Sequence, residues 1–289
     1  MRVPTSLVYA RANGAMGSLN ERANALQTQL STNTRLITAS DDPVGYRQLT
    51  AVRRATADAR QDAANVKQAQ TLLDASDAAL SEVETQLQRV NELAIKANSG
   101  SLSPEQRELI ATELDGIVED MLRLANTADA NGAPLFGGNA DTAYVRASDG
   151  SISYAGSGNR GAIPIGDGAS VQPTTTGDQA FGAMFASVQS FAANLRGGTS
   201  ATGAIDDVKA ALASVGTARA SIGVRGARLE LEADRIATAQ LDREETRSAI
   251  EDVDITATVT ELQKTLTVLQ ATQASFTKLT SLSLFNYLR

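Results

Sequence analysis

Two adjacent carboxylates, Asp41 and Asp42, are the first residues in this sequence that could carry chemistry. A carboxylate pair can serve as general acid and base or bind a cation. Pro43 follows directly, and proline fits the first position of a helix, where negative charge and an aspartate N-cap are both favourable. The segment is therefore interpreted as a helix cap or hinge formed by Asp41, Asp42 and Pro43.

A second acidic group, Glu251, Asp252 and Asp254, invites a calcium or magnesium site. Its spacing does not match an EF-hand loop, and no other ligand set accompanies it. A role at a helix start or hinge is the simpler interpretation, and we predict no metal site.

The residue inventory excludes most enzyme chemistry, because the chain has no cysteine and no histidine. Thiolate nucleophiles, disulfides, Cys/His metal sites and imidazole bases are all absent. We expect no catalytic residue and no cofactor. The net charge of −7 argues against binding to nucleic acid, and no run approaches the roughly 18 apolar residues that membrane insertion requires.

Both ends of the chain carry heptad seams, in which apolar residues alternate at steps of three and four. We predict that these seams pair as a coiled coil and serve as an assembly interface. The predicted interface residues are Met16, Leu19, Leu26, Leu30, Ile37, Val259, Leu262, Leu266, Leu269, Phe276, Leu284, Phe285 and Leu288.

A longer seam predicts one helix over residues 44–98, which at ~1.5 Å per residue would extend roughly 80 Å. The next helix has a clear start, with Ser103 as N-cap, Pro104 at the first position and Gln106 completing a capping box. Helical periodicity resumes beyond residue 204 and continues towards residue 250. These helices are expected to pack antiparallel.

The centre of the chain has a different texture, rich in glycine and poor in charge. Alternating runs at 143–148 and 151–155, joined at Asp149 and Gly150, predict a hairpin with a type I′ turn. A single helix is predicted over residues 178–195.

The expected fold is mainly α with a small β-rich insertion, an elongated rod whose N- and C-terminal helices pair. Three domains are predicted: a terminal coiled-coil domain (1–40 plus 251–289), a helical rod domain (41–137 plus 178–250), and a small β-rich variable domain (138–177).

Several segments resemble the flagellin and hook-associated protein family, most closely its hook–filament junction branch. They are Ser-Asp-Asp-Pro-Val-Gly at 40–45, Leu-Gln-Arg-Val-Asn-Glu-Leu-Ala at 87–94, Leu-Ala-Asn-Thr at 124–127, Leu-Phe-Gly-Gly at 135–138, Glu-Asp-Val-Asp at 251–254 and Ser-Leu-Phe-Asn-Tyr-Leu at 283–288. The resemblance covers about residues 1–138 and 204–289.

The resemblance implies a secreted, extracellular structural protein of the bacterial flagellum, exported through the type III channel and placed between hook and filament. Its implied partners are copies of itself, the second junction protein, flagellin and a cytosolic export chaperone. A short filament-forming flagellin is the alternative. A surface glycan-binding protein, using Tyr144, Tyr154 and the aromatic residues from Phe181 to Phe191, is a third hypothesis.

Overall fold

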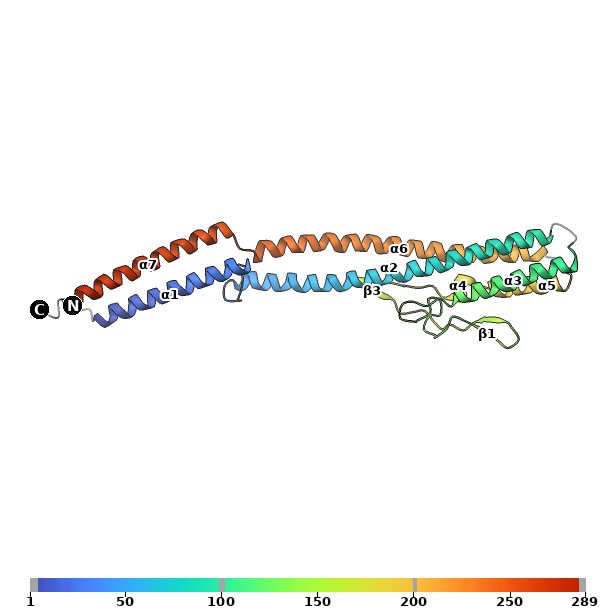
Figure 1. Ribbon diagram of the computed structural model, residues 1–289, viewed down its shortest axis with the longest axis horizontal. Helices are drawn as coiled ribbons and strands as arrows, with labels where there is room; N and C mark the ends of the chain where they lie inside the picture. The colour runs from blue at the N-terminus through green and yellow to red at the C-terminus, as the bar shows by residue number, and fades with distance from the viewer. Residues whose placement is uncertain (1–4, 99–101, 200–201, 286–289) are drawn as a thin grey trace. The chain divides into compact units, whose positions relative to one another are not determined.

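The computed structural model describes residues 5–98, 102–199 and 202–285. Within these ranges the chain forms seven helices and two small antiparallel sheets (Figure 1). The helices are α1 (Thr5–Thr32), α2 (Pro43–Asn98), α3 (Pro104–Ala125), α4 (Gly177–Phe181), α5 (Met184–Arg196), α6 (Thr202–Glu251) and α7 (Ile255–Phe285); the strands are β1 (Tyr144–Arg146), β2 (Ile152–Tyr154), β3 (Ile163–Gly166) and β4 (Ala169–Val171). The predicted class, mainly α with a small β insertion, is confirmed.

The chain divides into two compact units. The first lies within Met1–Asp58 and Ala239–Arg289, and the second is Ala59–Thr238. Helices α2 and α6 each have residues in both units. The division into three domains stays a prediction. Among the described residues, no helix is both long and apolar enough to cross a bilayer.

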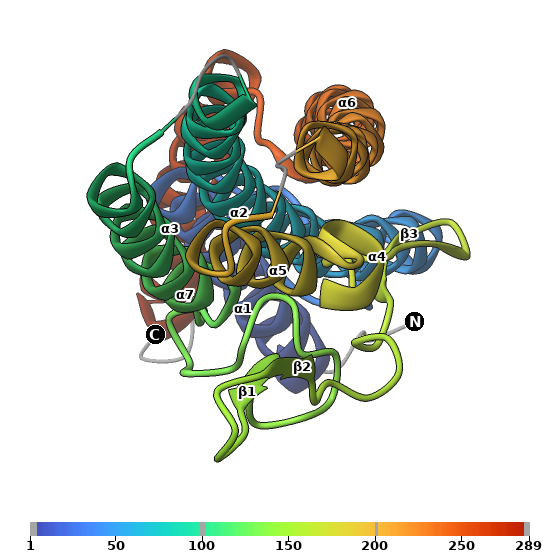
Figure 2. The same cartoon turned by 90° about the vertical axis from the view of Figure 1, so that its right-hand side faces the viewer.

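In the second unit, the helices pack around a core that the long seam predicts. Leu80 and Leu87 of α2, Leu114 and Met121 of α3 and Val215 of α6 are all completely buried. Burying a leucine side chain fully contributes roughly 1.5–3 kcal/mol, so this seam supplies much of the unit's stability. Figure 2 shows α3 beside α5, and the two helices are in contact along their length.

The predicted helix boundaries in this part of the chain are confirmed. Helix α2 begins at Pro43, one residue from the predicted start, and ends at Asn98. The Gln106 amide donates to Ser103 Oγ at 3.3 Å, and the Ser103 amide donates to Gln106 Oε1 at 2.9 Å, which completes the capping box.

The first hairpin pairs β1 with β2 as predicted, but its turn is not of type I′. That turn requires positive φ at both central residues. Only Gly150 has it, with φ 87°, while Ala147 and Ser151 are hydrogen-bonded around a three-residue loop. Loops of three residues are usually closed by one left-handed residue, which is the role of Gly150.

A second hairpin, β3 with β4, was not predicted from the sequence. Its turn holds Asp167 at φ 49° and Gly168 at φ 72°, both left-handed as a type I′ turn requires.

The single helix predicted over 178–195 is wrong, because it breaks into α4 and α5. Gly182 ends α4 with φ 52°, a conformation that interrupts a right-handed helix and that glycine adopts without steric cost.

Candidate assembly interface

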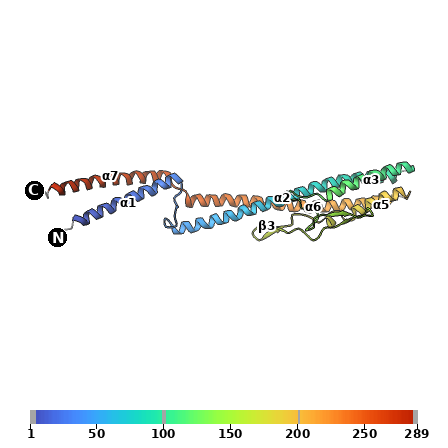
Figure 3. The same cartoon turned by 60° about the horizontal axis from the view of Figure 1, so that its bottom comes forward.

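The terminal helices α1 and α7 lie side by side and antiparallel within the first unit (Figure 3). The rings of Tyr9 and Phe276 meet edge to face with centroids 5.5 Å apart. Thirteen positions further along α1, Arg22 forms an ion pair with Glu261 at 3.1 Å. Since the partner's number falls as the α1 number rises, the two helices run in opposite directions. The predicted pairing of the ends is therefore confirmed.

On α1, the predicted seam faces this partner. Met16, Leu19, Leu26 and Leu30 are half-buried, and Ala23 between them is buried. The heptad pattern extended the helix through Ile37, and this extension is wrong. Helix α1 ends at Thr32, the next residue adopts a left-handed conformation with φ 54°, and Ile37 lies exposed in the connector to α2.

On α7, part of the predicted seam faces α1 and part of it is rotated away. The buried positions are Thr258, Thr265 and Leu269, while Val259 and Leu266 are 36% and 42% exposed. Val259 and Leu266 each follow a buried threonine by one residue, which places them about 100° further around the helix. The apolar side chains of Val259 and Leu266 therefore remain partly exposed to solvent within the described chain.

Among the other predicted α7 residues, Phe276 belongs to the contact through its ring pair with Tyr9. Leu262 and Phe276 are half-buried. Leu284 and Phe285 fall in the last turns of α7, where only the backbone is described, and Leu288 lies outside the described residues.

The Asp41–Asp42–Pro43 segment forms the start of α2. Asp42 Oδ1 accepts from the amides of Val44 at 3.1 Å and Gly45 at 2.9 Å, and Pro43 is the first helical residue. Asp41 turns the other way, because its Oδ2 accepts from the amide of Thr38 at 2.8 Å. This backbone hydrogen bond from Thr38 holds the pKa of Asp41 below its usual value.

The carboxylates of the second acidic group do not converge. Glu251 is paired with arginines, Asp252 accepts from Ser248 Oγ at 2.6 Å, and Asp254 accepts from the amide of Ala257 at the start of α7. In the described ranges, no cluster of three acidic or other metal-ligating side chains is arranged to hold an ion. Asp254 is thus a helix cap.

The central aromatic residues pack into a core, in which all but the half-buried Tyr154 are buried. Tyr144, Phe181 and Phe185 are at most 5% exposed, and the Tyr144 ring lies 4.8 Å from the Phe185 ring and 5.9 Å from the Phe181 ring. The Tyr144 hydroxyl donates to the Gly177 carbonyl at 2.9 Å. The glycan-binding hypothesis loses the surface on which it depended.

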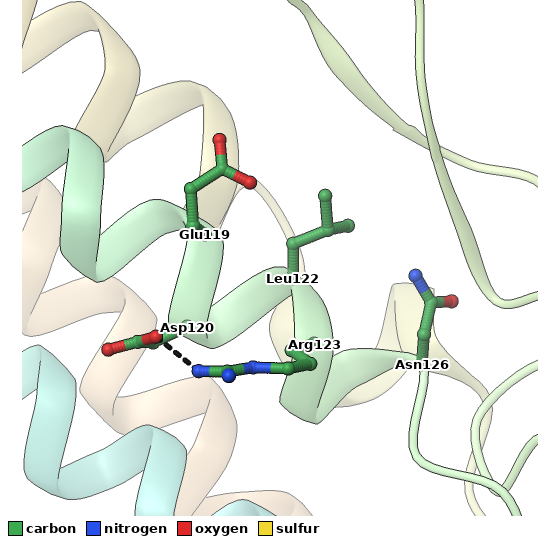
Figure 4. Close-up of a pocket in the computed structure, with 5 residues that line it drawn as sticks. All are labelled: Glu119, Asp120, Leu122, Arg123 and Asn126. Carbon is green, nitrogen blue, oxygen red and sulfur yellow. Dashed lines mark hydrogen bonds and ion pairs between the residues drawn. The ribbon is translucent and has the colours of Figure 1, made fainter.

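A shallow depression at the end of α3 is lined by Leu122 and by polar side chains that already have partners (Figure 4). Arg123 pairs with Asp120 and Glu119 with Arg146. The Asn126 amide donates to the Tyr144 carbonyl and accepts from the Tyr144 backbone N–H, both at 2.9 Å. Glu119 and Asn126 thus connect α3 to β1, whereas the Arg123–Asp120 pair lies within α3.

Two family models match the chain at its two ends. The bacterial flagellin N-terminal helical region matches residues 3–141, and the bacterial flagellin C-terminal helical region matches residues 205–288. The chain belongs to the flagellin and hook-associated protein family. Both models include the terminal helices and stop short of the β-rich centre.

Curated relatives of the family extend over nearly the whole chain. Flagellar hook-associated protein 3 of Escherichia coli strain K12 is 28% identical over 99% of each chain. A flagellin of Listeria monocytogenes is 24% identical over 91% of this chain and 90% of its own. A solved flagellar hook associated protein-3 from Legionella pneumophila covers 74% of this chain and 99% of that one, with a TM-score of 0.54 and 15% identity, which supports the fold alone.

Membership in this family makes the chain a structural component of the extracellular bacterial flagellum, and the predicted class is confirmed.

Sequence reasoning missed three residues of the paired ends. Tyr9 precedes Met16 by seven residues, so the α1 seam could have been continued back to it. Thr258 and Thr265 are polar, and a search for apolar residues alone passes over them, although they too are seven residues apart.

Proposed function

We propose that this chain joins the hook to the filament and that it assembles through α1 and α7. The observation that supports assembly is the rotated part of the α7 seam, in which Val259, Leu266 and Ile255 remain 36%, 42% and 57% exposed. Apolar surface of this kind on paired helices marks an interaction site.

Neighbouring subunits would supply the missing cover. Burying the remaining area of a side chain that is 42% exposed, such as Leu266, would contribute about 1 kcal/mol. One contact is weak, but a lattice repeats it at every subunit. The proposed partners are further copies of the chain, the second junction protein and flagellin, reached after type III export with a cytosolic chaperone.

The junction role rests on the full-length similarity to flagellar hook-associated protein 3 of Escherichia coli. Deleting the gene in the native bacterium should leave hooks intact and release flagellin into the medium, as seen by electron microscopy. Filaments that stay attached to hooks in the deletion strain would refute the proposal.

A filament-forming flagellin is the second candidate, favoured by the similarity to the Listeria monocytogenes flagellin. Purified protein incubated with a precipitant discriminates between the two. Long filaments favour flagellin, whereas lasting monomers favour the junction protein. Assembly, with no catalytic step, is the proposed activity in both cases.

The interface itself can be tested with a matched pair of variants. Leu266→Ser changes the uncovered seam of α7, and Leu231→Ser changes a leucine of α6 that is 72% exposed and lies in the second unit. Both side chains are exposed, so both variants should fold. Leu266→Ser should fail to restore filament attachment in the deletion strain and Leu231→Ser should restore it; equal restoration would contradict the assigned interface.

A further inference from the structure

The connector between α1 and α2 and the connector between α6 and α7 are joined through their backbones. The Arg35 amide donates to the Glu251 carbonyl at 2.7 Å, and Thr34 forms an isolated antiparallel bridge with Asp252. The Arg35 guanidinium also donates to the Ile250 carbonyl at 2.8 Å. The two connectors are more than 200 positions apart in the sequence, and these hydrogen bonds hold them side by side.

One buried carboxylate, that of Glu251, links the paired connectors to both long helices. The Glu251 side chain is 8% exposed, and its two oxygens have different partners: Oε1 accepts from Arg53 of α2 at 2.5 Å and Oε2 from Arg247 of α6 at 2.9 Å. All of these residues belong to the first unit.

A buried carboxylate between two guanidiniums is sensitive to change, because removing one member leaves a charge without compensation in a site of low dielectric. The arginines are partly exposed, at 55% for Arg53 and 32% for Arg247, so water can reach them if the carboxylate is lost. Glu251 is therefore the member on which the arrangement depends.

The contact between α1 and α7 holds these two helices to each other, through the Tyr9–Phe276 ring pair, the Arg22–Glu261 ion pair and a seam of side chains. None of these residues belongs to α2 or α6. The angle at which the pair leaves α2 and α6 must then be set at the connectors.

We propose that Glu251 is a positioning residue that holds the two connectors together as one rigid joint. We call its paired set of side chains, Glu251, Arg53 and Arg247, the latch. With the latch closed, α1 and α7 leave α2 and α6 as one body; with it open, each terminal helix turns about its own connector. This inference concerns the isolated chain and does not depend on the junction role.

The test uses the absence of native cysteine, which allows spin labels to be placed at two chosen positions. Cysteines at Gln27 of α1 and Thr246 of α6, both exposed, report the distance across the joint by pulsed electron resonance. Glu251→Gln keeps the side-chain shape and removes the charge. The distance distribution should be narrow in the native chain and clearly broader in Glu251→Gln.

Amide exchange on the same chains supplies a second readout. Exchange should rise about tenfold or more at residues 34–37 and 252–254 together, as the loss of a charge-assisted hydrogen bond implies. Amides near Leu80 and Leu87 in the second unit should be unchanged, which separates opening of the latch from general destabilisation.

The matched control is Glu244→Gln, which makes the same charge change on α6 beside the same Arg247, at a side chain that is 63% exposed. It should leave the distribution narrow. If Glu251→Gln does not fold, Arg53→Gln removes one partner only and should broaden the distribution to a lesser degree. An unchanged distribution in the folded variant, a rise in exchange limited to residues 252–254, or equal broadening in Glu244→Gln would overturn the proposal.

Discussion

Replacing Gly45 by alanine tests how tightly the start of α2 is packed. A Cβ added at Gly45 would lie 2.6 Å from Asp42 Oδ2 and 3.0 Å from Leu36 Cδ1. The first distance is shorter than real Cβ contacts, so the carboxylate that caps α2 would have to move. Leu36 Cδ1 is the end of a flexible side chain and has only to shift by a few tenths of an ångström.

Two opposing effects set the magnitude. Alanine within a helix is more favourable than glycine by about 0.8–1.0 kcal/mol. A displaced Asp42 loses its bonds to the Val44 and Gly45 amides, and loss of an N-cap costs about 0.5–2 kcal/mol. In the native background, Gly45→Ala should therefore be close to neutral or destabilising. In an Asp42→Ala background the cap is already gone, so the same change should stabilise the helix by up to about 1 kcal/mol.

Amide exchange at Tyr46 and Arg47, converted into free energies of local opening, measures this double-mutant cycle. The expected outcome is a coupling of about 1 kcal/mol, with Gly45→Ala more favourable once Asp42 is absent. Additive effects would refute the reasoning, since they would mean that alanine does not displace the carboxylate.

Three further predictions concern other parts of the chain. Phe276→Ala should weaken the α1–α7 pair by about 0.5–1.5 kcal/mol beyond the lost area, through loss of the ring contact with Tyr9, and should speed amide exchange in both helices. Burial raises the pKa of Tyr144, so above about pH 10 the unfolded chain releases a proton that the folded chain keeps, and stability should fall with a slope of at most about 1.4 kcal/mol per pH unit. Urea unfolding from pH 9 to 11 should show this slope in the native protein and a smaller one in Tyr144→Phe. Gly116 lies on α3, where an added Cβ would meet nothing within 4 Å, so Gly116→Ala should raise the free energy of unfolding by about 0.4–1 kcal/mol. A lower free energy of unfolding in urea would contradict the absence of a steric neighbour at this position.

The sequence predicted those features whose signal lies in local chemistry. Ser103, Pro104 and Gln106 determine a helix start with their own side chains, and the long seam of α2 specifies a buried face by its spacing alone. The turn at Asp167 and Gly168 carried the same dipeptide as the predicted turn at 149–150. Its flanking strands are short and contain Pro164, which is uncommon within strands, so their own signal is weak.

The candidate interface was predicted in part, because periodicity identifies an apolar face but not the neighbour that covers it. On α7 the face that meets α1 contains Thr258 and Thr265 beside Leu269, whereas the apolar Val259 and Leu266 lie further around the helix. Arg247 lies one helical turn before Glu251, which is a local spacing, but Arg53 lies 198 positions away, so no local pattern could have placed it beside them.

The buried threonines of α7 have a kinetic consequence. Thr265 Oγ1 donates to the carbonyl of Glu261 in its own helix at 2.7 Å, so its hydroxyl needs no partner on α1. When α1 and α7 part, this hydroxyl stays hydrogen-bonded, so separation leaves no unsatisfied polar group at Thr265. The cost of parting the two helices then comes from the apolar side chains and the Tyr9–Phe276 ring pair, and a neighbouring helix that covers the same apolar side chains can offset that cost.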